Sequence, residues 1–138
     1  MSFTVLRVPS VGRAADAMTK RERRGYDAAV EGLKGEGCLA GGKRLADSRS
    51  GDYPMCQRSL YASWRLTTVY QPDGTVVIIS LAKHTKSDNP SAALAEIFPG
   101  LSVTGRRRSD QPPCCKEPTK PPELPPELAE ILFALLGV

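Results

Sequence analysis

The chain has little histidine and no long apolar run. Among its 138 residues there is one histidine, His84, and no stretch of about eighteen consecutive apolar residues. A membrane-spanning helix requires such a stretch, so we expect no membrane association. A lone histidine cannot by itself build a histidine-based metal site. We therefore expect neither a metal ion nor another cofactor.

A cysteine pattern typical of zinc sites or redox motifs is also missing. Cys38, Cys56, Cys114 and Cys115 form no C-x-x-C pair and no repeated ligand spacing. The first eighteen residues lack a charged segment followed by an apolar one, so we expect no secretory signal. We interpret the cysteines as reduced thiols of a cytoplasmic protein.

Charge is unevenly spread along the chain. The net charge is +4, and residues 1–100 carry 14 lysines and arginines against 10 acidic residues. Arg106, Arg107 and Arg108 follow, whereas residues 109–138 contain two lysines and five acids. The basic body suggests a polyanionic partner, although ordinary solubility charge explains a net charge of this size equally well.

The first half of the chain predicts one strand and one main helix. Residues 3–8 (FTVLRV) are mostly apolar and β-branched, which predicts a strand. A short helical turn is expected over 11–18. Thr19 and Glu22 match a capping box, and apolar spacing then predicts a helix over 20–34. We interpret the basic residues in its first half as a solvated face; they are Lys20, Arg21, Arg23 and Arg24.

The glycines within residues 35–52 predict that this segment is mostly loop, and three strands are expected after it. These are 53–61, 64–71 and 75–83, with a turn signal at 72–74. The last is nearly all apolar, which predicts a central strand buried on both faces. Short connections imply an antiparallel meander, and the helix would cover one face. The expected fold class is α+β, an N-terminal strand and helices packed on an antiparallel sheet.

The C-terminal part departs from this domain. We expect a second helix from about Pro90 to residue 98, and the domain then spans 1–101. Residues 102–126, first rich in arginine and then with seven prolines, read as a linker of polyproline character. Residues 127–137 show an apolar stripe that predicts an amphipathic helix. This helix completes the core, extends freely, folds back onto the domain or swaps onto a second copy, and the acidic linker could shade the basic face.

The order of these segments resembles the RelE/ParE superfamily of bacterial toxins over about residues 3–98. In that family a Lys-Leu element precedes the sheet, as residues 43–45 (KRL) do here. An aromatic-Arg-Leu strand then leads through a turn into a Val/Ile-rich strand, as in residues 64–66 (WRL) and 75–79 (TVVII). That strand ends in a basic cluster, here residues 83–86 (KHTK).

The resemblance implies a metal-free ribonuclease site. The RelE branch cleaves mRNA in the ribosome by attack of the ribose 2′-OH on the adjacent phosphate. By resemblance, Arg65 matches a phosphate-contacting arginine, and its planar fork suits that contact. Arg58 falls where relatives keep a basic residue, and it would act electrostatically because it stays protonated. His84 aligns with Arg or His, and because the unperturbed imidazole of histidine titrates near neutrality, this residue can serve as general acid or base.

Further residues are candidates for holding RNA: Lys43, Arg44, Lys83, Lys86 and Tyr61. The lysines would contact phosphates and the tyrosine could stack on a base. The alternatives are solvated charges for Lys83 and Lys86 and a core-edge position for Tyr61. We expect Trp64 in the core.

The resemblance gives the leading hypothesis of an mRNA interferase toxin whose partners are an antitoxin, mRNA and the ribosome. The ParE branch, which inhibits DNA gyrase without nuclease activity, is the alternative. The family's tyrosine after the basic cluster is absent, because Ser87, Asp88, Asn89 and Pro90 follow. A catalytically inactive RNA- or ribosome-binding relative is therefore a third hypothesis. The C-terminal helix also offers a route to self-association.

Overall fold

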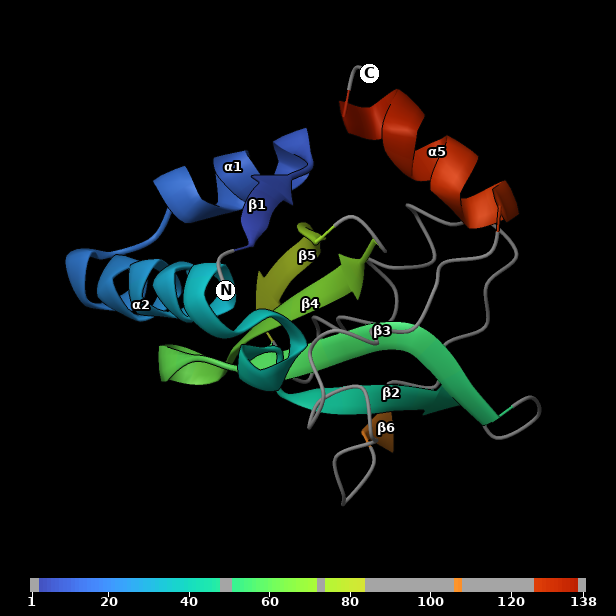
Figure 1. Cartoon of the computed structure of the whole chain (residues 1–138). Helices are drawn as coiled ribbons and strands as arrows, with labels where there is room; N and C mark the ends of the chain where they lie inside the picture. The colour runs from blue at the N-terminus through green and yellow to red at the C-terminus, as the bar shows by residue number, and fades with distance from the viewer. Residues whose placement is uncertain (1–2, 48–50, 72–73, 84–105, 108–125, 137–138) are drawn as a thin grey trace.

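The computed structural model describes residues 3–47, 51–71, 74–83, 106–107 and 126–136. It is an α+β fold in which helices cover a six-stranded sheet (Figure 1). The helix predicted from about Pro90 to residue 98, most of the linker, and His84 and Lys86 lie outside these residues.

The N-terminal elements form where the sequence predicts them. Strand β1 (Thr4–Arg7) leads into α1 (Pro9–Asp16), which has proline at its first position. Helix α2 (Lys20–Glu36) begins with the predicted capping box, in which Thr19 and Glu22 each accept a backbone N–H bond from the other. The short helical turn η1 (Gly37–Ala40) follows.

The sheet contains more strands than expected. Strands β3 (Gly51–Ser59), β4 (Trp64–Tyr70) and β5 (Thr75–Lys83) form the predicted meander, with the turn η2 (Tyr61–Ser63) between the first two. The prediction of loop over 35–52 is wrong in part, because β2 (Lys43–Asp47) pairs antiparallel with β3. Two residues assigned to the linker form β6 (Arg106–Arg107) and pair with β2. Both strands are short, and they form because of the strands they pair with rather than because of their own sequence pattern.

The sheet is mixed rather than antiparallel, which corrects the expected fold class in this detail. Its order is β1-β5-β4-β3-β2-β6. Strand β1 pairs with β5 in parallel, with Val5 opposite Val76 and Arg7 opposite Ile78. The α1–α2 segment and the meander connect these two strands, and a parallel pair requires such a long connection.

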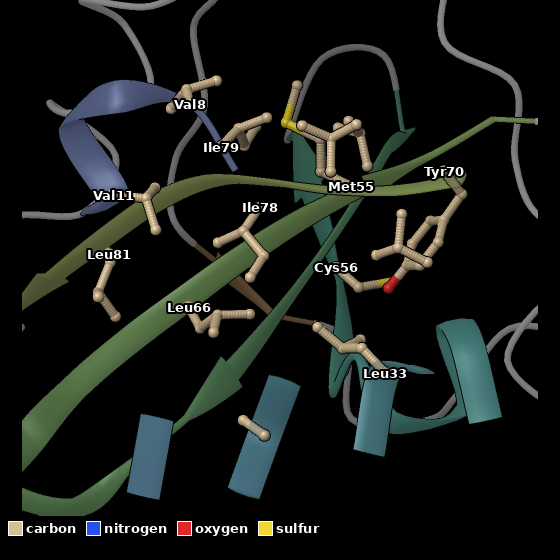
Figure 2. Packing of buried hydrophobic residues seen from close by; sticks show 14 of the residues in the cluster. Val8, Val11, Leu33, Met55, Cys56, Leu66, Tyr70, Ile78, Ile79 and Leu81 are labelled. Carbon is tan, nitrogen blue, oxygen red and sulfur yellow. The ribbon is translucent and has the colours of Figure 1, made fainter. Parts of the chain in front are cut away.

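The core lies on both faces of the central strand. Every residue of β5 from Val76 to Leu81 is buried, and because successive side chains point to opposite faces, both faces are covered. This confirms the prediction made from the apolar run. Leu33 of α2 lies toward Cys56 of β3, and Val8 lies near Ile79 of β5 (Figure 2).

The C-terminal helix is part of this core. Helix α5 (Pro126–Leu136) matches the predicted 127–137 within one residue at each end. Its Leu132 is completely buried in the core cluster, and Ala129, Ile131 and Leu136 pack against that cluster. Of the readings left open by the sequence, the structure supports a helix that completes the core.

Candidate nucleic-acid interface

The first turn of α2, the β3–β4 connection and the end of β5 meet at one corner of the molecule. Trp64 at the start of β4 lies opposite Lys83 at the end of β5. Both side chains reach Glu22 of α2, and the neighbouring Arg21 reaches Tyr61. We call these five residues the aromatic corner.

Glu22 organises the corner from within. One carboxylate oxygen accepts the Thr19 backbone N–H at 2.9 Å. The other accepts the Trp64 indole N–H at 2.6 Å and lies 3.3 Å from the Lys83 ammonium. The Thr19 backbone bond, and then the Trp64 bond, lower the pKa of Glu22 from 4.5 to about 2. The carboxylate is therefore charged, and Lys83 neutralises it locally.

Two cations lie over two aromatic rings at this corner. The Arg21 guanidinium is 5.7 Å from the centre of the Tyr61 ring, and its Nη1 donates to the Tyr61 hydroxyl at 3.3 Å. The Lys83 ammonium is 5.6 Å from the centre of the Trp64 ring. Both distances are within the range of a cation–π interaction. Tyr61 is 52% exposed, so its ring is accessible rather than at the edge of the core.

Arg23, the next cation of α2, is used differently. Its guanidinium lies 3.1 Å from Asp27 and 3.4 Å from Asp16, and the bond to Asp27 raises its pKa. Its charge is thus balanced by two neighbouring acids. The four basic residues in the first half of this helix are therefore not equivalent, and Arg21 is the one held at the aromatic corner.

Arg58 lies farther along the sheet, on the face that α2 covers. Its guanidinium donates to the Ala40 carbonyl at 3.1 Å. It lines an open hollow of about 410 Å³ together with Gly32 and Glu36 of α2. A half-buried arginine with one N–H donor used in this way keeps other donors for an anion.

Arg65 lies on the opposite face of the sheet from Arg58. The register pairs Arg58 with Leu66, and Arg65 with Ser59, so the two arginines alternate across the sheet. The structure therefore does not bring these two predicted catalytic residues together on one face. On the Arg65 face, Gln57 and Thr67 lie opposite each other and share a 3.2 Å hydrogen bond.

The structure describes only some of the remaining predicted site residues. Lys43 and Arg44 begin β2, opposite Gln57 and Cys56 of β3. His84 follows the last described residue of β5, so its position relative to Arg65 is not described. Lys83 is at the predicted strand end, with its ammonium bonded to Glu22.

Sequence reasoning missed Arg21, Glu22 and Trp64 as members of one site. The capping box pointed to Glu22, but only as a helix start. Its second oxygen meets Trp64, 42 positions later in the chain. No local pattern encodes that contact. The expectation that Trp64 packs at the core holds, because its ring is half-buried against the core cluster.

Comparison with models of protein families, with curated proteins and with solved structures found no match. No helix in the described part of the chain has the length and apolar character needed to cross a membrane. The same residues contain no group of three or more His, Cys, Asp or Glu side chains placed to bind a metal ion.

Proposed function

We propose that this protein is a RelE-type toxin that acts on mRNA. The aromatic corner carries the proposal, because aromatic rings interleaved with cations suit single-stranded RNA. Tyr61 and Trp64 supply the rings, and Arg21 and Lys83 supply the cations. The α+β fold, with β1 and two helices before the meander, is compatible with the resemblance in sequence.

In this proposal the RNA backbone approaches the end of the sheet where β4 begins and β5 ends. Arg65 is one residue from this end, opposite Ala82 and on the other face of the sheet from Trp64 and Lys83. It would contact the scissile phosphate through its planar fork where the RNA passes around the strand end. His84, one residue beyond β5, would transfer a proton during attack of the ribose 2′-OH. Lys83 has three ammonium donors and uses one of them on Glu22, so it can still bind a phosphate.

Arg58 enters the proposal in a reduced role. It lies on the other face from Arg65 and one strand farther from the end of β5, and its guanidinium is bonded to the Ala40 carbonyl. We assign it to the hollow beside α2 rather than to the reacting phosphate.

The test is induced expression in bacteria, with cleavage of cellular mRNA mapped by primer extension. The wild type is compared with the double variant Arg65→Ala/His84→Ala and with Lys34→Ala. Lys34 lies in the last turn of α2, away from the aromatic corner, and pairs with Glu31. We expect growth arrest and cut transcripts for the wild type and Lys34→Ala, and loss of both for the double variant.

Other outcomes separate the alternatives. Arrest without cut transcripts, together with inhibited DNA supercoiling, would favour a ParE-like gyrase inhibitor. Arrest with ribosome binding but intact transcripts would favour an inactive RNA-binding relative. Growth without arrest would contradict the toxin proposal itself.

A further inference from the structure

The β3–β4 connection holds Tyr61 in an unusual position for a large aromatic side chain. More than half of its surface is exposed, and it is one of four large hydrophobic residues described as exposed. Its Cβ lies 3.6 Å from the position that a Cβ on Gly25 would occupy, so the base of the side chain rests on α2. The side chain is therefore in contact with α2 at its base while more than half of its surface remains exposed.

The backbone beneath Tyr61 adopts a conformation that side chains disfavour. Ala62 has φ 61° and ψ 38°, and Ser63 has φ 64°, although neither is glycine. The left-handed region brings Cβ close to the carbonyl oxygen and is usually left to glycine. The loop is closed by the Leu60 N–H, which donates to the Trp64 carbonyl at 2.8 Å. Two such residues in succession persist where the surroundings impose them, and they cluster at binding sites.

Arg21 completes the arrangement around the ring. Its Nη1 bond to the Tyr61 hydroxyl and its position 5.7 Å from the ring centre hold two flat groups together. The backbone of the next residue, Glu22, starts from the capping box, so the position of Arg21 is set by a rigid helix start. Through Glu22 the same helix turn also fixes Lys83, which lies over the Trp64 ring.

We propose that Arg21 and Tyr61 form a stacking site for one unpaired RNA base, with Lys83 contacting a phosphate of the same strand. The proposal rests on the proposed function and adds a base-binding position to it. A tyrosine face and an arginine plane both stack on bases, and the base must be unpaired to reach them. A duplex would present phosphates only, which gives the site its preference for single strands.

Binding of a fluorescein-labelled single-stranded RNA of about twelve nucleotides tests the proposal by fluorescence anisotropy. We expect Tyr61→Ala to weaken binding by roughly 5- to 150-fold, and Tyr61→Phe to remain within about twofold of the wild type. Phe133→Ala removes another exposed ring, on α5, and should change nothing. The same strand annealed to its complement should bind the wild type and Tyr61→Ala equally.

A second variant tests the role of the strained loop. Ala62→Gly/Ser63→Gly relieves the backbone without touching the ring, so we expect a higher melting temperature and weaker single-strand binding. Equal binding by Tyr61→Ala and the wild type would overturn the proposal. So would an equal loss of single-strand and duplex binding in Tyr61→Ala, because stacking would then not be the cause.

These results are separable from the toxin assay. Single-strand binding that depends on Tyr61, without arrest or cleavage, would leave the stacking site standing and contradict the toxin function. Arrest and cleavage that persist in Tyr61→Ala, with unchanged RNA binding, would contradict the stacking site alone.

Discussion

At the scale of single residues, Glu22 has the most consequential position in the described structure. It is 7% exposed, yet its two oxygens accept hydrogen bonds from a backbone N–H and an indole N–H and face an ammonium group. A buried carboxylate is stable only when its oxygens are partnered in this way. It ties the helix start to two strand ends that are far away in sequence.

The first prediction concerns pH. The pKa of Glu22 is about 2 in the folded protein against 4.5 as the ordinary value. Because the folded pKa is lowered, its stabilising effect is present above pH 4.5 and is lost as the pH falls toward 2. We expect Glu22→Gln to have a lower melting temperature than the wild type at neutral pH, and the gap to narrow with acidification. Melting curves of both proteins, recorded from neutral to acidic pH, measure the difference in melting temperature. A difference that does not change with pH would contradict the prediction.

The second prediction concerns two glycines with similar backbone angles. A Cβ on Gly42, at φ 90°, would lie 2.2 Å from the Gln57 carbonyl oxygen, whereas a Cβ on Gly74, at φ 87°, would meet nothing within 4 Å. We expect Gly74→Ala to lower the free energy of unfolding by about 1–2 kcal/mol through the backbone angle alone. Gly42→Ala should lower it by at least about 3 kcal/mol, because backbone must also move.

Urea denaturation of both glycine variants gives the comparison. Gly74→Ala serves as the control for the backbone angle. Equal decreases in the free energy of unfolding of the two variants would show that the close approach of Gly42 to β3 does not add to the effect of the backbone angle.

At the scale of elements, the packing of α5 shows the role of the C-terminal segment in the fold. The sequence allows a helix that completes the core, a free extension, a helix that folds back onto the domain or an exchanged helix. In the structure Leu132 is buried in the core cluster of the same chain, while Phe133 and Leu135 remain exposed. The helix is thus a structural part of the domain.

The third prediction follows from this packing. Leu132→Ala should lower the free energy of unfolding by about 2–5 kcal/mol, because it removes a completely buried side chain. Leu135→Ala, on a residue that is 38% exposed, should change it by less than about 1 kcal/mol. Thermal or urea unfolding measures both. Similar small effects of the two substitutions would mean that α5 does not support the core.

At the scale of the whole molecule, the distribution of charge matters more than its sum. The net charge is +4, but Arg23 and Lys34 are paired with acids of their own helix. The cations left for a polyanion are therefore fewer than the composition indicates.

The fourth prediction is a modest salt dependence of RNA binding. If about three phosphates are contacted, the logarithm of the association constant should fall with the logarithm of salt concentration with a slope of about −2. Lys83→Ala, which removes the proposed phosphate contact, should make the slope shallower by about 0.7, and Lys34→Ala should leave it unchanged. Anisotropy titrations at several salt concentrations measure this, and an affinity independent of salt would contradict electrostatic recognition.

The sequence by itself determined the elements whose signals are local. The capping box at Thr19 located the start of α2, and the apolar run of β5 indicated a strand buried on both faces. The turn signal that includes Gly74 and the apolar stripe of α5 could also be recognised in the sequence. Each of these patterns reflects contacts within a few residues or along one periodic face, so it can be recognised from residues that are close in sequence.

Only the tertiary structure decided which distant residues meet. The parallel pairing of β1 with β5 and the pairing of β2 with β3 and β6 depend on partners far along the chain. The register also placed Arg58 and Arg65 on opposite faces, where the order of strands alone suggested one array. A shift of one residue in a strand reverses every side chain, and local sequence does not fix the register. For the same reason Glu22, Trp64 and Lys83 form one site that only the folded chain shows.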